Sequence, residues 1–304
     1  MSSNLARFNC FVLSVVLTLA TFVEHGFSND DSAKKSDQLI LVVMDPLAAP
    51  LACDCVKGYA QRKYETLGEH LTVRLKRPVK VVWGGALKLA TVDVDGRADI
   101  IIGKHSVVLH DAALAKMEVE PIAYLTGLDG STTQTGLIVV RSADRAKTAA
   151  DLKGYKILFG TPDCDEKSAA VMRLLTKHNI DIPAKPETYD ACSIAATTLF
   201  EMDEKIDAAA VISSYAQPLL EGCGTIQKGD LRIVAETKPV PFVTAFANKK
   251  LDPSLVAEVQ KALLAVGESE ALLKSLETKN GFVSVKSKSA DTTADPATVA
   301  KKKN

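Results

Sequence analysis

Short apolar runs alternate with longer amphipathic stretches along most of the chain. Residues 38–44 (QLILVVM) form a continuous apolar run that is typical of a buried strand. In residues 58–75 the apolar positions recur every three or four residues, which predicts a helix with one buried face. Further strands are predicted at 79–83, 98–103 and 136–140. This alternation predicts parallel strands joined by crossover helices, and therefore an α/β fold.

The same alternation returns in the second half of the chain. The predicted elements are strands at 156–159, 208–212, 231–236 and 244–247, and helices at 166–178, 193–202 and 253–266. Residues 286–304 are polar and show no periodicity, so we expect a disordered tail there.

The first residues carry the pattern of a secretory signal. Arg7 supplies a positive charge, and residues 8–23 form an apolar run that is shorter than the ~20 residues of a spanning helix. Small residues follow at Gly26 and Ser28, so residues 1–28 are predicted to be a cleavable signal peptide, the alternative being an uncleaved anchor. Because Cys10 lies at the start of the apolar run and follows no lipobox, we expect a periplasmic or secreted protein that is not a lipoprotein.

The composition is that of a globular protein without a dominant charge. Hydrophobic residues make up 47% and charged residues 24%, and the length of 304 residues allows two domains. Lys and Arg together number 37, as do Asp and Glu. No large basic field is therefore available for nucleic acid or a membrane surface, and we expect no nucleic-acid partner.

Several phrases, in this order, resemble the phosphonate-type periplasmic substrate-binding proteins of ABC importers. The phrases are LILVVMDPLAAP at 39–50, RADIIIG at 97–103, GLIVVRSADRAKTAADLKGYKILFGTPD at 136–163, IDAAAVISS at 206–214 and the stretch from LRIVAETKPVPF to LLAV at 231–266. The DLKG turn with its following Gly-Thr-Pro is the most specific of them, and the resemblance covers about residues 38–270.

This resemblance implies the two-lobed, type 2 periplasmic-binding-protein architecture. Each α/β lobe has a mixed sheet flanked by helices, and two hinge strands join the lobes. Lobe 1 is predicted to comprise 38–137 and 241–285, and lobe 2 to comprise 138–240. The resemblance also implies a monomeric receptor without a cofactor or catalytic activity, a membrane permease as partner, and a small oxyanion (phosphonate, phosphite or phosphate) as ligand.

Ligands of open α/β sheets bind beyond the carboxyl ends of strands, where helix N-termini offer N–H groups to anions. The segments 45–55, 104–106, 161–168, 190–193 and 213–215 occupy such places. The residues predicted to contact the solute are Asp45, Lys104, His105, Ser106, Thr161, Cys164, Ser168, Asp190, Ser213 and Tyr215.

Residues 163–168 (DCDEKS) depart from the family, whose proteins present a helix start rich in Ser and Thr to the phosphonate oxygens. Carboxylates at this place would repel a dianion, since two like charges ~4 Å apart cost about 4 kcal/mol at an effective dielectric of about 20. The alternative is that Asp163 caps the helix while Asp165 and Glu166 point into solvent.

The cysteines leave three interpretations open. The chain has six, and loss of Cys10 with the signal leaves five, of which Cys53, Cys55, Cys164 and Cys192 fall on the predicted site segments. Together with His105 they form a candidate site for zinc or copper(I). For an exported protein, disulfides from Cys53 or Cys55 to Cys164 or Cys192 are favoured, because two cysteines one residue apart cannot easily bridge each other.

The third interpretation is an enzyme on the same fold. Cys164 would be the nucleophile and His105 its base, although no third member of a triad is apparent and neighbouring carboxylates would raise the pKa of the thiol. Cys223 is expected to stabilise the fold or to be a spare thiol. A sensory protein of the same fold, docking a partner through the basic tail, is a further alternative.

Overall fold

The computed structural model describes residues 37–52, 56 and 60–285. The predicted signal peptide, the predicted tail, Cys53 and Cys55 lie outside the described residues. Within the part of the chain that is described, no helix has both the length and the apolar character that a membrane span requires.

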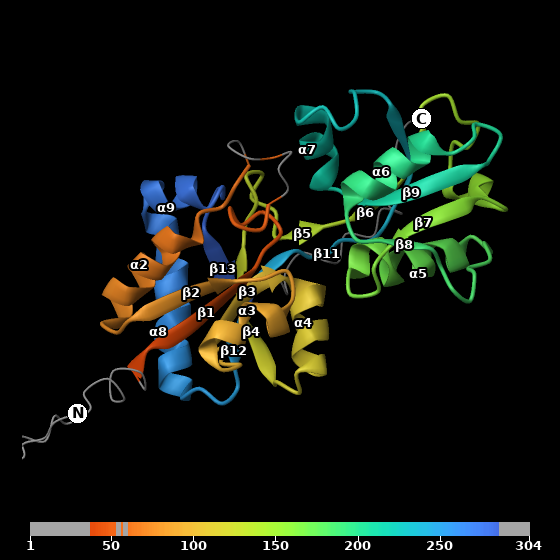
Figure 1. The fold of residues 1–304 in the computed structure, drawn as a ribbon. Coiled ribbons are helices and arrows are strands. Elements are labelled where there is room, and N and C mark those ends of the chain that lie inside the picture. The colour runs from red at the N-terminus through yellow and green to blue at the C-terminus, as the bar shows by residue number, and fades with distance from the viewer. Residues whose placement is uncertain (1–36, 53–55, 57–59, 286–304) are drawn as a thin grey trace, which may run out of the picture. The chain divides into compact units, whose positions relative to one another are not determined.

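The first of two main sheets has the strand order β13-β4-β12-β3-β1-β2 (Figure 1). Its strands are β1 (Leu39–Met44), β2 (Val79–Trp83), β3 (Ile100–Lys104), β4 (Val119–Leu125), β12 (Val243–Asn248) and β13 (Phe282–Ser284). β1 pairs in parallel with β2 and β3, as predicted. β12 runs antiparallel to both β3 and β4, so the sheet is mixed, as the type 2 architecture implies.

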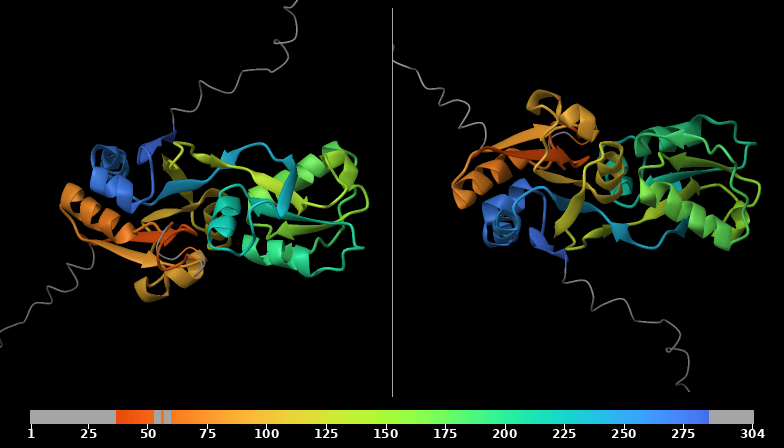
Figure 2. Two further views of the ribbon diagram at one scale, coloured as in Figure 1. Left: turned by 90° about the horizontal axis from the view of Figure 1, so that it is seen from above. Right: turned by 90° about the horizontal axis from the view of Figure 1, so that it is seen from below.

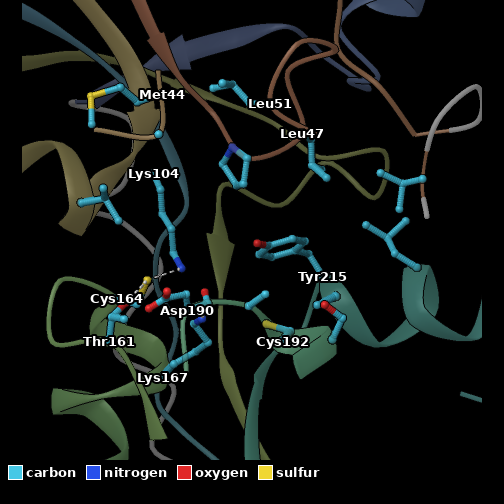
Figure 3. A pocket seen from close by; sticks show the side chains of 18 of the residues that line it. Met44, Leu47, Leu51, Lys104, Thr161, Cys164, Lys167, Asp190, Cys192 and Tyr215 are labelled. Carbon is cyan, nitrogen blue, oxygen red and sulfur yellow. Dashed lines mark hydrogen bonds between the residues drawn. The ribbon is translucent and has the colours of Figure 1, made fainter. Parts of the chain in front are cut away.

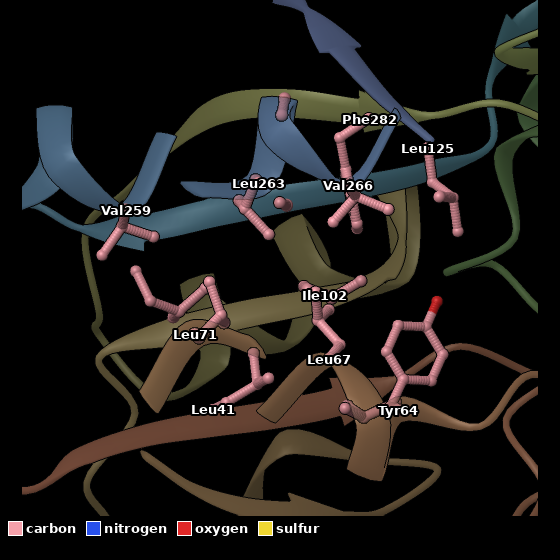
Figure 4. Close-up of a cluster of buried hydrophobic side chains, with 14 of the residues drawn as sticks. Leu41, Tyr64, Leu67, Leu71, Ile102, Leu125, Val259, Leu263, Val266 and Phe282 are labelled. Atoms are coloured by element: carbon pink, nitrogen blue, oxygen red, sulfur yellow. The ribbon is translucent and has the colours of Figure 1, made fainter. Parts of the chain in front are cut away.

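Helices cover both faces of this sheet. The helices are α2 (Tyr64–Leu75), α3 (Leu87–Ala90), α4 (His105–Leu114), α8 (Pro253–Leu264) and α9 (Glu270–Ser275). Leu41 of β1 and its alternate neighbours pack against α2 and α8, whose side chains meet in Figure 4. Ile40, on the opposite face of the strand, packs with residues of α3 and α4. Burial of both faces explains why residues 39–44 form a continuous apolar run.

The second sheet has the order β10-β6-β9-β7-β8. Its strands are β6 (Gly136–Arg141), β7 (Lys156–Gly160), β8 (Thr188–Tyr189), β9 (Ala208–Ser213) and β10 (Leu231–Glu236). β7 pairs in parallel with β8 and β9, whereas β6 runs antiparallel to β9 and β10. Residues of α5 (Ala169–Lys177) join one buried cluster, and residues of α6 (Cys192–Glu201) and α7 (Ala216–Gly222) join another. Figure 2 gives two further views of these helices and strands.

Two connections join the sheets. β5 (Thr133–Gln134) precedes β6, β11 (Val240–Pro241) follows β10, and the two pair as a short antiparallel ribbon between the sheets in Figure 1. The second sheet is therefore built from one continuous stretch of chain, whereas the first draws on residues before and after it. The two linking strands, β5 and β11, agree with the prediction that two hinge strands join the lobes. The exact residues at which each lobe begins and ends stay a prediction.

The helix predicted at 166–178 is divided in the structure. A short 3₁₀ turn, η4 (Asp165–Lys167), comes first, and α5 begins only at Ala169. Ser168 lies between them with φ −127° and ψ −93°, outside the helical range, so the direction of the side chains changes at this point. Glu166 and Lys167 consequently point to the interior instead of continuing the amphipathic pattern of α5.

Candidate ligand-binding pocket

A pocket of about 490 Å³ lies where segments after the strands of both sheets come together. The first sheet contributes residues that follow β1 and the end of β3. The second sheet contributes the loop after β7, the start of α6 and the start of α7, as the close view shows (Figure 3). Carboxyl ends of strands are where open α/β folds bind their ligands, so this is the candidate site.

Most of the pocket wall is apolar. The apolar lining residues include Met44, Pro46, Leu47, Leu51, Val56, Val107, Leu219 and Leu220. The ring of Tyr215 is part of the wall and stacks on Phe242, with the ring centroids 4.6 Å apart. Such a wall suits the hydrocarbon part of a small organic molecule.

A buried ion pair joins the two sheets at the polar end of the pocket. Lys104, the last residue of β3, donates from Nζ to Glu166 Oε1 of η4 at 2.5 Å. Lys104 is 5% exposed and Glu166 has no exposed surface. Burial lowers the pKa of Lys104, but the neighbouring Glu166 carboxylate outweighs this effect and the pKa lies above its ordinary value. Lys104 is therefore a cation at neutral pH.

The Glu166 carboxylate receives a second donor from the other sheet. Ser213, at the end of β9, donates from Oγ to the same Oε1 atom. Lys104 Nζ also donates to Cys164 Sγ at 3.2 Å, a contact drawn in Figure 3. The second oxygen, Glu166 Oε2, is buried and has no hydrogen-bond partner among the described residues. Glu166 Oε1 thus accepts two hydrogen bonds, while Oε2 could still accept one from another donor.

A second contact between the sheets lies beside this pair. The Asp165 main-chain N–H donates to Ser106 Oγ of α4 at 3.1 Å, and the Asp165 carboxylate pairs with Arg173 at 3.1 Å. The interpretation that Asp163 caps a helix while Asp165 and Glu166 point into solvent is wrong for Glu166, which is buried. Asp163 lines the pocket, and neither η4 nor α5 has a side-chain cap.

Lys167 is the second buried cation at the pocket. It is 3% exposed, and its Nζ donates to the main-chain oxygen of Asp190 at 3.3 Å. Among the residues that the structure describes, no carboxylate lies within ion-pair distance of it. Its stem packs on Gly160, where a Cβ would come within 2.4 Å of Lys167 Cβ, so only glycine leaves room for it. Lys167 is not among the residues predicted to contact the solute, and Gly160 at the end of β7 is the feature of the sequence that could have indicated it.

The predicted contact residues divide into two groups. Those that line the pocket are Lys104, Thr161, Cys164, Asp190 and Tyr215. Those that lie behind the wall or away from it are Asp45, His105, Ser106, Ser168 and Ser213. Ser213 contacts Glu166 and the pocket-lining Cys192, to whose sulfur its main-chain N–H donates at 3.4 Å. Whether the lining residues touch a ligand stays a prediction.

Asp45 has a structural role in the fold. It is fully buried, and its carboxylate accepts from Arg62 Nη1 at 2.8 Å and from the Tyr64 hydroxyl at 2.5 Å. It also accepts from the main-chain N–H of Leu47, at the start of the segment that lines the pocket. These bonds fix the conformation of the chain after β1.

His105 is the first residue of α4 and does not line the pocket. Its Nδ1 lies 3.0 Å from Thr244 Oγ1, and its ring packs on Phe246 at 5.2 Å between centroids. Burial lowers the pKa of His105, although the charge of Asp165 opposes this shift. These contacts do not pair His105 with Cys164, so the arrangement lacks the nucleophile and base of the enzyme interpretation.

Cys164 and Cys192 carry free thiols, and both line the pocket. The predicted disulfides from Cys164 or Cys192 are therefore not formed in this structure, and Cys53 and Cys55 lie outside the described residues. Within the described ranges, no three His, Cys, Asp or Glu side chains lie close enough together to hold a metal ion. The Cys164, Cys192 and His105 part of the candidate metal site is not assembled.

Residues 58–290 match the family model described as "ABC transporter, phosphonate, periplasmic substrate-binding protein". The chain belongs to this family. Proteins of the phosphonate-type family are the periplasmic components of ABC importers, bind small molecules and work with a membrane permease. A comparison with curated proteins finds no match.

Solved structures show the same fold. A binding-protein component of an ABC phosphonate transporter from Pseudomonas aeruginosa is 12% identical, with a TM-score of 0.61 and coverage of 81% of each chain. A Prochlorococcus marinus protein in complex with methylphosphonate is also 12% identical, with a TM-score of 0.59 over 82% of this chain and 92% of that one. The alkanesulfonate-binding protein of Xanthomonas axonopodis bound to MOPS is 18% identical, with a TM-score of 0.50 over 78% and 74%. The phosphonate-type chain thus has the type 2 periplasmic-binding fold, as predicted.

Proposed function

We propose that this phosphonate-type protein binds a small organic molecule with a single negative charge and delivers it to the permease of an ABC importer. Organic sulfonates and singly ionised phosphonates belong to this class. The ligand's hydrocarbon part would lie on the apolar wall, and its anionic group would lie at the polar end beside Lys104 and Lys167.

The charge of the buried groups supports this ligand class most directly. Lys104, Lys167 and Glu166 are all nearly or fully buried at one end of the pocket. Among these buried groups, two lysines and one glutamate carry a net charge of one positive unit, which a single negative charge on the ligand neutralises. The Asp163 and Asp190 carboxylates also line the pocket, but they are more exposed and therefore more strongly screened by solvent. A dianion would leave an excess negative charge in a poorly solvated place, so fully ionised phosphate or phosphonate is disfavoured.

The polar groups around the cations fit the same class. Thr161 and Tyr215 line the pocket near Lys104 and can donate hydroxyl hydrogens to an oxyanion. Burial raises the pKa of Tyr215, so its hydroxyl keeps its proton and remains a donor at neutral pH. Binding would stabilise a closed arrangement of the two lobes through the linking strands β5 and β11.

Calorimetry of the purified protein with butanesulfonate tests the proposal, with inorganic phosphate, zinc and copper as comparison solutes. We expect heat of binding with butanesulfonate and none with a tetraalkylammonium ion of similar size. Lys167→Met should abolish the binding, because it removes one of two cations, whereas Lys177→Met at the exposed end of α5 should leave it unchanged. Absence of binding for alkanesulfonates of every chain length, or equal binding of the cation, would overturn the proposal.

A further inference from the structure

We propose that Glu166 sets the charge of the ligand, because its carboxylate already fills an anion site between Lys104 and Ser213. This inference rests on the proposed function. A ligand with one negative charge finds a complementary pocket, whereas a ligand with two meets the charge of Glu166. Substitution of Glu166 by a neutral residue should therefore admit a dianion.

The geometry is that of an occupied oxyanion site. The Lys104 ammonium and the Ser213 hydroxyl approach the same oxygen, Glu166 Oε1, from different sheets. A cation and a hydroxyl donor are the groups that bind an oxygen of an external sulfonate or phosphonate. Here Glu166 supplies that oxygen, and Lys104 uses one of its three N–H donors to bind it.

The carboxylate cannot easily leave this place. A Cβ on Gly136 would come within 1.8 Å of the Glu166 main-chain oxygen, so the backbone of η4 lies directly against the start of β6. The side chain of Lys167, the next residue, packs against Gly160. Because the backbone at Glu166 is held against β6, its carboxylate stays directly behind the pocket-lining residues Lys104, Cys164 and Lys167.

The charges of the buried groups then determine which ligand fits. With Glu166 ionised, the buried set of Lys104, Lys167 and Glu166 has a net charge of one positive unit. With a neutral residue at 166, the two lysines alone give two positive units. The unpartnered Glu166 Oε2 adds to the effect, since an uncompensated carboxylate oxygen repels further negative charge in a region of low dielectric.

Butanesulfonate and butylphosphonate are suitable probes, because they have similar size and shape. The sulfonate keeps one negative charge at every working pH, whereas the phosphonate gains a second as the pH rises. In the unaltered protein we expect sulfonate affinity to stay constant with pH and phosphonate affinity to fall as the dianion forms. In Glu166→Gln we expect the phosphonate dianion to bind at least about tenfold more tightly than in the unaltered protein.

Asp165→Asn is the matched control. It removes the same charge one residue away, but the Asp165 carboxylate pairs with Arg173 outside the pocket lining. This variant should keep the discrimination of the unaltered protein. An equal gain in dianion affinity in both variants would show a general charge effect and overturn the role of Glu166.

The remaining outcomes separate the inference from the proposed function. If the unaltered protein binds neither probe but Glu166→Gln binds the dianion, the native ligand class is wrong and the role of Glu166 stands. If the unaltered protein binds the sulfonate and Glu166→Gln gains nothing for the dianion, the role of Glu166 is wrong. Should Glu166→Gln not fold, the pH profile of the unaltered protein decides, and tighter binding of the dianion than of the monoanion would refute the inference. Binding of neither probe by either protein would refute both proposals.

Discussion

The main-chain oxygen of Glu166 lies against Gly136, so closely that a Cβ on this glycine would come within 1.8 Å of it. The start of β6 and the turn η4 therefore touch through their backbones, without a side chain between them. The position of the Glu166 carboxylate depends on this contact, because η4 carries both Glu166 and Lys167.

Gly136→Ala should lower the free energy of unfolding by about 1–3 kcal/mol, because the added methyl group forces η4 away from β6. Urea denaturation followed by circular dichroism measures the change. Gly85→Ala is the control for stability, since a Cβ on Gly85 meets no atom within 4 Å. Equal stability of Gly136→Ala and the unaltered protein would contradict the close contact.

Lys104 and Glu166 should show strong energetic coupling in a double-mutant cycle. Lys104→Met or Glu166→Gln alone leaves one buried charge without its partner and should cost about 3–5 kcal/mol. The double variant removes both charges, so it should cost clearly less than the sum of the two single variants. Additive losses in urea denaturation would show that the two side chains do not interact in the folded protein.

Tyr64→Phe should destabilise the protein by about 1.5–3 kcal/mol, because the Tyr64 hydroxyl donates to the buried carboxylate of Asp45. Tyr189→Phe removes a similar bond to Glu187 at an exposed position, and the loss should be much smaller. Thermal denaturation of the two variants makes the comparison. If both variants unfold at the same temperature, the Asp45 network contributes less than its burial indicates.

His105 should make the protein less stable in mild acid. Burial lowers the pKa of His105 in the folded state, so the unfolded chain takes up the proton more readily. The stabilising effect is complete above the ordinary histidine pKa of about 6.5 and is lost as the pH falls toward the lower folded value. Urea denaturation between about pH 7.5 and about pH 5 should show a decline that His105→Asn reduces.

His110→Asn is the control for this pH dependence, because His110 is on the same helix and exposed. It should keep the slope of the unaltered protein. A slope that is the same in His105→Asn would assign the acid sensitivity to other groups, such as the carboxylates.

The strands with continuous apolar sequence could be predicted closely. β1, β3, β7 and β9 are within two residues of their predicted bounds, because burial on both faces requires an apolar run. β2 is only partly buried, and its bounds follow from its β-branched residues after Pro78. β4 was missed, since Glu120 and Pro121 interrupt its pattern. The pairing of β12 with β4 shifts register where Phe246 meets Pro121, and this irregularity accommodates the proline within the sheet.

The direction of β12 could not be predicted from its own residues. Its sequence fits a parallel or an antiparallel strand equally well, and the chain's return from the second sheet decides between them. α4 was missed as an element because its apolar residues, including exposed Leu109 and Leu114, do not form one stripe.

The strand ends that carry the predicted site residues come together at one pocket. Lys104, Thr161, Cys164 and Tyr215 line it, and their contact with a ligand stays a prediction. Glu166 and Lys167 could not be assigned to the interior, because an ordinary helix beginning at 166 would direct them differently from the 3₁₀ turn that the structure contains. The partner of Glu166 lies 62 residues away, a separation at which local patterns carry no information.

The place of β12 in the first sheet has a consequence for the order of folding. This strand lies between β3 and β4, yet its residues are made after the whole second sheet. Gly136 to Glu236 can assemble around its own apolar clusters as the nascent chain lengthens. The edges of β3 and β4 that pair with β12 stay unpaired until residue 248 has been synthesised. During synthesis, this half of the protein is therefore the part most exposed to aggregation and to binding by holdase chaperones.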